Sequence, residues 1–185
     1  MIADLTSLAQ LVEDKKAVSP GGAESVFIPI NDKWAIKIIQ SAVLVDWNNT
    51  YDDDEMTLEV ARDIMYGRQK AVAELGYAPE VGDKINLPDG TFGYITEIVE
   101  AAKVPPADFG YQAAEEFNNA DPFYCEYLEA NKKGTIEIII DEIEAETSWR
   151  MTDSHGGNWG RKNGQWVVID FGCAIKEGEK NWLED

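Results

Sequence analysis

The sequence predicts an α+β fold that forms one globular unit with two lobes. Three observations lead to this prediction. A β-hairpin pattern covers 26–39, a long amphipathic segment covers 56–75, and a late apolar run at 166–169 follows an Asn-Gly turn. Because 44% of the 185 residues are hydrophobic, the chain can bury a core of ordinary size.

The N-terminal part is predicted to contain a short amphipathic helix over 4–16, where apolar residues recur at helical spacing. Strands at 26–30 and 34–39 flank a turn at 31–33, as in a β-hairpin. Lys37 stands between apolar residues of the second strand, where a cation needs a partner. The alternative is an edge-strand lysine whose ammonium group reaches solvent.

The middle of the chain is predicted to contain several helices and one strand. A long helix over 56–75 ends at Gly76, a residue that favours helix ends. A strand over 90–100 follows a Pro-Asp-Gly turn signal. Segment 105–133 indicates one or two short helices with an aromatic stripe in the core, and isoleucine spacing favours a helix over 135–149. The stripe consists of Tyr111, Phe117, Phe123, Tyr124, Tyr127 and Leu128.

Composition argues against several classes of function. The chain has 35 Asp and Glu against 16 Lys and Arg, a formal net charge of −19, so binding of nucleic acid through a basic face is not expected. The sequence shows no signal-peptide pattern and no apolar run of about 18 residues, so no membrane partner is expected. Two cysteines predict no disulfide framework and fit a cytoplasmic location.

Polar residues flank the late hairpin. Its turn signal is Asn163-Gly164, so Asn158 stands just before the first strand and Asp170 just after the second. This arrangement brings an amide oxygen and a carboxylate to one edge, and Mg²⁺ is usually held by one or two protein oxygens together with substrate phosphates. Asp153 could reach the same space and accept a proton from an attacking hydroxyl.

The pattern Asp153-x-His155-x-x-Asn158, followed by Asp170-Phe171-Gly172, resembles the catalytic loop and metal-binding turn of the protein-kinase-like superfamily. The version with His in the third place is similar to that of aminoglycoside and small-molecule kinases and of some atypical protein kinases. The resemblance implies that Asp153 is the catalytic base and that Asn158 and Asp170 bind Mg²⁺. His155, the single histidine of the sequence, is implied to order the site or to contact the cofactor.

An earlier segment, Ala35-Ile36-Lys37, is similar to the kinase strand whose lysine holds the nucleotide phosphates. The resemblance therefore gives Lys37 both a catalytic and an ATP-binding role. Gly21 and Gly22 resemble part of the Gly-rich loop that covers the phosphates, without its full pattern of glycines.

The long predicted helix resembles the kinase C-helix, which supplies a glutamate to pair with the strand lysine. Glu59 and Asp63 are four residues apart on one helix face, and either could reach Lys37. We favour Glu59. Counting back from the loop that follows the helix puts Met65 or Gln69 near the expected place instead.

The strand over 90–100 resembles the strand that leads into the kinase hinge. Thr96 would then be the gatekeeper, and the backbone carbonyl of Glu97 and N–H of Val99 would bind the adenine edge. A second copy of the turn motif, Asp108-Phe109-Gly110, has no predicted strand before it, and we interpret it as a loop or a helix start.

The resemblance implies a bilobal protein-kinase-like fold. Residues 1–100 would form an N-lobe with an antiparallel sheet and the C-helix, and 101–185 a truncated, mostly helical C-lobe. Met151-Thr152 stand where many protein kinases have His-Arg, so regulation by loop phosphorylation is not expected. The given sequence ends 13 residues after Gly172, so no activation segment is expected in it.

Two functions follow as hypotheses. The first is a kinase that uses ATP and Mg²⁺ to phosphorylate a hydroxyl of a protein or small molecule. The second is a pseudokinase-like binding module that acts on a basic partner protein through its acidic surface. A homodimer could complete the missing lobe, and the compact size and acidity resemble those of phage-encoded kinase-like proteins. In a third interpretation the motifs are accidental, and the chain is an acidic α+β protein.

Overall fold

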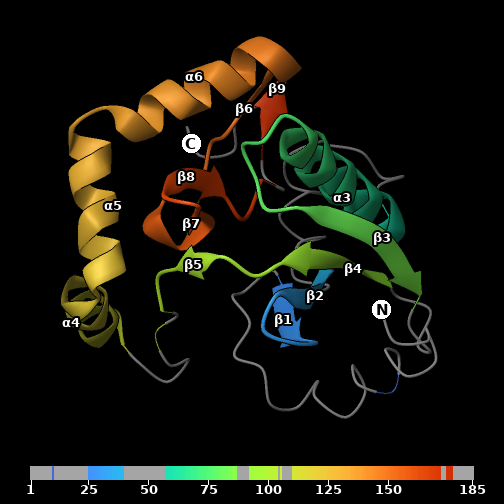
Figure 1. Cartoon of the computed structure of the whole chain (residues 1–185), viewed down its shortest axis with the longest axis horizontal. Helices are drawn as coiled ribbons and strands as arrows, with labels where there is room; N and C mark the ends of the chain where they lie inside the picture. Colours follow the sequence, from blue (N-terminus) through green and yellow to red (C-terminus); the bar gives the residue numbers. More distant parts are fainter. Residues whose placement is uncertain are drawn as a thin grey trace. The chain divides into compact units, whose positions relative to one another are not determined.

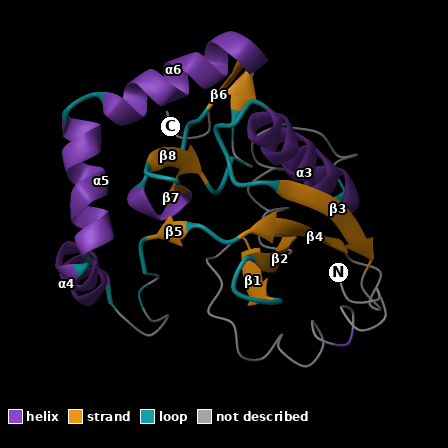
Figure 2. Ribbon diagram, viewed as in Figure 1, coloured by secondary structure: helices purple, strands orange, loops and turns teal. Residues whose placement is uncertain are grey.

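The computed structural model describes residues 10, 25–39, 57–86, 92–103, 105, 110–171 and 174–176. The chain divides into two compact units, the first formed by Met1–Tyr66 and Glu80–Ile98, the second by Gly67–Pro79 and Val99–Asp185. Figure 1 follows the elements along the chain, and Figure 2 separates helices from strands. The predicted helix over 4–16 lies outside the described residues, except for Gln10, which is helical.

Within the described residues, the first unit contains a four-stranded antiparallel sheet in the order β1-β2-β4-β3. The predicted hairpin is confirmed, because β1 (Ser25–Pro29) pairs with β2 (Trp34–Ile39). Its turn is fixed by Asn31, whose side-chain oxygen accepts hydrogen bonds from the backbone N–H groups of Lys33 and Trp34 at 2.9 and 3.0 Å. This is the local bonding that makes asparagine a good turn residue.

The two faces of this sheet bury different sets of side chains. One face carries the cluster of Val26, Ile28, Ile36, Ile38, Ile85 and Ile95. On the other face, Ile39 and Tyr94 pack against Ala61 and Met65 of helix α3 (Leu58–Glu74), which confirms the predicted long helix. The buried Arg62 of α3 donates from Nε to the carbonyl of Ile39 at 2.9 Å, which adds a polar tie to this packing.

One strand of the sheet is not predicted from the sequence. Strand β3 (Val81–Asn86) pairs with β4 (Phe92–Glu97), and its register shifts between Val81 and Lys84. The shift interrupts the period-two alternation on which strand prediction depends, and Gly82 and Asp83 are poor strand formers.

In the described part of the second unit, helices α4 (Tyr111–Ala120), α5 (Pro122–Lys132) and α6 (Thr135–Thr147) follow one another, as predicted for this region. Gly110 of the second turn motif is the N-cap of α4, while Asp108 and Phe109 lie outside the described residues. None of the helices described here combines the length and the apolar character that crossing a membrane requires.

Short strands complete the second unit. Strands β5 (Glu100–Ala101), β7 (Trp159–Lys162) and β8 (Gln165–Val168) form an antiparallel sheet in that order. Strand β6 (Trp149–Arg150) pairs with β9 (Ile175–Lys176). Together the sheets and helices of the two units confirm the α+β fold class.

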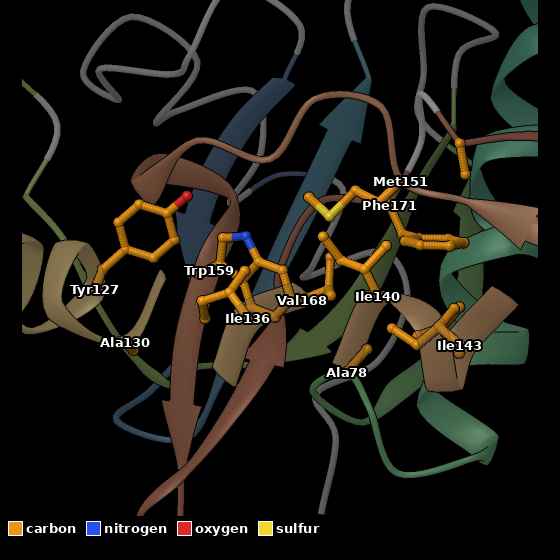
Figure 3. Packing of buried hydrophobic residues seen from close by; sticks show 12 residues of the cluster. Ala78, Tyr127, Ala130, Ile136, Ile140, Ile143, Met151, Trp159, Val168 and Phe171 are labelled. Atoms are coloured by element: carbon orange, nitrogen blue, oxygen red, sulfur yellow. The ribbon is translucent and has the colours of Figure 1, made fainter. Parts of the chain in front are cut away.

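The core of the second unit forms where α5 and α6 cover the β7–β8 hairpin (Figure 3). Phe123 and Tyr127 are buried as predicted, but Tyr111 is 88% exposed and Leu128 is 42% exposed. The predicted stripe is therefore wrong in part. Asp121 ends α4 and begins α5, so the helical phase restarts, and no residue of α4 is buried. The core consists of Val72, Ala78, Tyr127, Ala130, Ile136, Ile140, Ile143, Met151, Trp159, Val168, Phe171 and Ala174.

The acidic face of α6 is partly neutralised within the chain. Arg150 donates to Asp141 at 3.0 Å and to Glu144 at 2.6 Å, and it also pairs with Glu137. These carboxylates raise the pKa of Arg150 above its ordinary value. A single cation thus offsets part of the acidity that dominates the composition.

Asp121 joins three segments of the second unit and is only 7% exposed. Its carboxylate caps α5 by accepting from the N–H groups of Phe123 and Tyr124 at 2.8 and 3.4 Å, and it accepts from the N–H of Lys103 at 2.9 Å. The Lys103 bond is the largest cause that holds the pKa of Asp121 below its usual range, with the cap bonds adding to it against the effect of burial.

We predict that Asp121→Ala lowers the free energy of unfolding by about 1–2 kcal/mol, because it removes the cap. A depressed pKa means that the stabilisation is present above the unfolded pKa of about 4 and is lost as the pH falls through the folded pKa. Urea unfolding at pH 7 and pH 3 should therefore show the larger difference at pH 7. Glu115→Ala, on an exposed position of α4, is the matched control. An equal effect of both substitutions would contradict the prediction.

Candidate active site

The β7–β8 hairpin places the predicted metal ligands at one end. Its turn is Asn163-Gly164, with φ angles of 51° and 81°, the positive values that a two-residue hairpin turn requires. At the other end Trp159 faces Val168, and the backbone N–H of Ile169 donates to the carbonyl of Asn158 at 2.9 Å. Asp170 follows Ile169 directly, so the predicted juxtaposition of Asn158 with the start of the turn at Asp170 is present.

Asn158 is also bound to Asp153. Its Nδ2 donates to the backbone carbonyl of Asp153 at 2.9 Å and to the carboxylate Oδ2 at 3.2 Å. Both bonds use the nitrogen of the amide, so the oxygen is the atom that it can offer to a cation. The predicted base and one predicted metal ligand thus belong to one hydrogen-bonded pair.

His155 completes this loop. Its Nδ1 accepts from the N–H of Gly157 at 3.0 Å, while Nε2 lies 3.5 Å from Oδ2 of Asp153. A neutral imidazole whose Nδ1 accepts carries its proton on Nε2, the nitrogen that faces the carboxylate. The hydrogen bond from His155 is the largest cause that lowers the pKa of Asp153, and Asn158 adds to it although burial opposes the shift. Asp153 is therefore ionised at neutral pH and able to accept a proton.

Residues that the sequence analysis assigned no catalytic role hold this loop in place. Tyr127 of α5 donates from its hydroxyl to the carbonyl of Ser154 at 2.6 Å, and Trp159 donates from Nε1 to the hydroxyl oxygen of Ser154 at 3.2 Å. Burial raises the pKa of Tyr127, which keeps its hydroxyl protonated as a donor. In the sequence Tyr127 carried only the apolar signal of the aromatic stripe, which predicted its burial but not this bond, and no role was predicted for Trp159.

Gly156 lies where the loop closely approaches α5. A Cβ at this position would be 2.5 Å from the ring of Tyr124 and 2.9 Å from that of Tyr127. The loop can therefore approach the helix this closely only if residue 156 is a glycine. At the next residue, Gly157, a Cβ would meet only the imidazole of His155, at 2.8 Å.

Gln69 contacts the backbone of the turn that contains Asp170. The side chain is 3% exposed, donates from Nε2 to the carbonyl of Val168 at 3.0 Å, and accepts from the N–H of Phe171 at 2.8 Å. From the sequence, Gln69 or Met65 was expected near the position of the glutamate that pairs with the strand lysine. The described contacts of Gln69 are instead with the backbone on both sides of Asp170.

Lys37 lies in the first unit, on β2, and is only 3% exposed. Strand β2 is flanked by β1 and β4, so the alternative of an edge-strand lysine that reaches solvent is wrong. The ladder places Lys37 opposite Tyr94, on the face that packs against α3. A lysine buried in a central strand needs polar partners, because a buried cation is costly without them.

The predicted partners of Lys37 on α3 differ in their surroundings. Asp63 forms an ion pair with Lys84, which is a different lysine from the one predicted. Glu59 is exposed in the first turn of α3, and its pairing with Lys37 stays a prediction. Met65 is buried in the cluster between α3 and the sheet.

The predicted hinge residues follow one another at the end of β4. Thr96 is buried opposite Ala35. Glu97 exchanges hydrogen bonds with Glu80, donating its N–H at 2.9 Å and accepting at its carboxylate at 3.3 Å. Val99 is half-buried between β4 and β5. Their adenine-binding roles stay predictions, and Gly21, Gly22 and Gly172 lie outside the described residues.

The oxygens of Asn158 and Asp170 are the groups that could hold a metal. Among the described residues, no group of three or more His, Cys, Asp and Glu side chains could bind one. Mg²⁺ does not need such a group, because it commonly takes one or two protein oxygens and completes its shell with phosphates and water. Because the side-chain nitrogen of Asn158 donates to Asp153, the side-chain oxygen is the atom that can act as a ligand for this ion.

No protein-family model matches the sequence, and no curated protein matches it either. The chain is similar to the GDP complex of wild-type aminoglycoside 2'-phosphotransferase-IIIa, with 10% identity, a TM-score of 0.42, and coverage of 93% of this chain and 74% of that one. It is also similar to the GDP and kanamycin complex of APH(2")-IIia, with 11% identity, a TM-score of 0.41, and coverage of 91% and 73%.

We predict that Gly156→Ala displaces the loop and lowers the free energy of unfolding by about 1–3 kcal/mol, because the added methyl group overpacks the contact with α5. Gly157→Ala should cost less, since only the end of the His155 side chain must move. Chemical unfolding of both variants measures the difference. A loss for Gly156→Ala no larger than that for Gly157→Ala would show that the loop does not depend on this close approach.

Proposed function

We propose that the protein is a kinase-type phosphotransferase that moves the γ-phosphate of ATP to a hydroxyl group with the help of Mg²⁺. The observation that carries this proposal is the hydrogen-bonded unit of Asp153 and Asn158, joined through the Ile169–Asn158 backbone bond to the residue before Asp170. A base and two oxygen ligands for a hard cation are among the groups that phosphoryl transfer takes from the protein.

In the proposed reaction, Asp153 accepts the proton of the acceptor hydroxyl while the oxygen of that hydroxyl forms a bond to the γ-phosphorus. The bond between that phosphorus and the β,γ-bridging oxygen breaks, and its electron pair leaves with ADP. The lowered pKa of Asp153 keeps the carboxylate ready for the proton, and His155 holds its orientation. Mg²⁺, bound by Asn158 and Asp170, would neutralise charge on the phosphates.

The remaining predicted residues complete the proposal. Lys37 would bind the phosphates, with Glu59 as its proposed partner and with Gly21 and Gly22 in a loop over the nucleotide. The backbone of Glu97 and Val99 would bind the adenine. The burial of Lys37 supports this proposal, because a buried lysine needs polar or charged groups to bind. The acceptor would be a hydroxyl of a small molecule or of a protein, and labelled ATP offered with a panel of both separates these classes.

A second candidate is a binding module that engages a basic partner protein through its acidic surface. The net charge of −19 favours it. Part of this charge is paired within the chain, as the carboxylates around Arg150 show. This candidate does not require Asp153 to be catalytic, and the kinetic experiment below uses that difference.

We predict that Mg²⁺-ATP raises the melting temperature, whereas ATP with a chelator has a much smaller effect. Ligand at about one hundred times its dissociation constant stabilises a folded protein by roughly 2.7 kcal/mol, which is several degrees for a chain of this size. Asp170→Ala should abolish the Mg²⁺-dependent part, and Asp32→Ala, in the exposed hairpin turn of the first unit, should retain it. No shift at millimolar Mg²⁺-ATP would reject the nucleotide site.

We predict that Asp153→Asn lowers the rate of phosphate transfer or ATP turnover by about 10²–10⁴-fold, because the base is lost while the shape of the side chain is kept. Binding of Mg²⁺-ATP should persist, as measured by the thermal shift. Asp32→Asn is the matched control. Capture of a partner protein that survives Asp153→Asn, together with no turnover by the wild-type protein, would favour the binding module.

A further inference from the structure

A buried amide is bound to the backbone on both sides of Asp170. Gln69 donates to the carbonyl of Val168 and accepts from the N–H of Phe171, so its two polar ends are both in use. Asp170 stands between these two attachment points, with Ile169. A side chain nine-tenths or more buried that makes two such bonds is costly to replace, because each partner would lose its hydrogen bond away from water.

Other backbone bonds restrict the same four residues. The N–H of Val168 donates to the carbonyl of Tyr77 at 2.8 Å, and the N–H of Ile169 donates to the carbonyl of Asn158 at 2.9 Å. Phe171 is 1% exposed and anchors the turn in the core of the second unit, to which Met151 also belongs (Figure 3). The backbone around Asp170 is therefore fixed from the catalytic loop on one side and from Gln69 and Tyr77 on the other.

We propose that Gln69 is a positioning residue, which holds Asp170 so that its carboxylate and the Asn158 amide oxygen bind Mg²⁺ together. The inference rests on the proposed function. It gives α3 a role that the sequence resemblance did not imply, because the neutral side-chain amide of Gln69 binds the backbone of the turn that contains Asp170. Residues that orient metal ligands through hydrogen bonds typically change metal affinity by about 10–100-fold when they are removed.

The chemistry of the site explains why the residue is glutamine. The carbonyl of Val168 needs a donor, and the N–H of Phe171 needs an acceptor. A neutral amide supplies both, whereas a carboxylate supplies only acceptors and would add a buried negative charge close to Asp170. Gln69→Glu keeps the size of the side chain and one of the two bonds. Gln69→Met keeps the size and removes both.

The experiment compares the wild-type protein with Gln69→Met, Gln69→Glu and Val72→Ala. Val72 lies on the same helix and is fully buried in the core of the second unit. Its side chain is apolar and cannot form a hydrogen bond to the turn, so Val72→Ala is the control for a general loss of stability. The readouts are the Mg²⁺ concentration that gives half of the ATP-dependent thermal shift, the shift with ATP and chelator, and hydrogen exchange at the Phe171 amide.

We predict that Gln69→Met raises the half-effective Mg²⁺ concentration by about 10-fold or more and speeds exchange at Phe171, with the metal-free ATP shift unchanged. Gln69→Glu should act in the same direction. Val72→Ala should lower the melting temperature without changing the Mg²⁺ requirement.

Two results would overturn the inference alone: an unchanged Mg²⁺ requirement in both Gln69 variants, or the same change in Val72→Ala. If neither Gln69 variant folds, exchange in the wild-type protein decides, because a Phe171 amide that exchanges as fast as an exposed one is not held by Gln69. A wild-type protein that shows no Mg²⁺-dependent shift would instead reject the proposed function and the inference with it, so the two failures are distinguishable.

Discussion

The hydrogen bond from the N–H of Ile169 to the carbonyl of Asn158 extends the β7–β8 ladder one step past its last paired residues. The candidate active site depends on that step. It fixes the position of Asn158 relative to Ile169, the residue that precedes Asp170. A slip of the hairpin by one residue would turn every side chain to the opposite face, so Trp159 and Val168 would leave the core and the polar groups would separate.

The hairpin keeps its register because its two ends are specified independently. At one end, Asn163 and Gly164 have the positive φ angles of a tight turn. At the other end, Trp159 and Val168 are fully buried beneath α5 and α6. The hairpin backbone is then in place before the polar side chains make their contacts. A site on a small scaffold can be preorganised in this way, here through the contacts of Asp153, Asn158 and Gln69.

Much of this arrangement could be read from the sequence, and the reasons for success and failure are physical. The hairpins were predictable because turn chemistry and apolar runs are local signals, and α3 and α6 because their apolar residues recur at helical spacing. Asp153 and Asn158 stood out because their spacing resembles a known catalytic loop. Strand β3 was hidden by its register shift. The stripe across α4 and α5 was misread because Asp121 restarts the helix.

The contacts of Gln69 and Tyr127 could not be predicted, since they join residues far apart in the chain. Gln69 lies 102 residues from Phe171, and Tyr127 lies 27 residues from Ser154. Neither amide nor hydroxyl carries a signal of its own in the sequence, because its meaning depends on which backbone group it meets after folding. Such partners appear only when the fold is known.

The turn at Asn163-Gly164 has a practical consequence. Both residues are exposed, and four paired positions of the hairpin separate them from Asn158. A backbone that is solvent-exposed and remote from the core accepts additional residues at small cost. This turn is therefore the natural place to insert a fluorescent or affinity label, which would report on the protein while leaving the opposite end of the hairpin undisturbed.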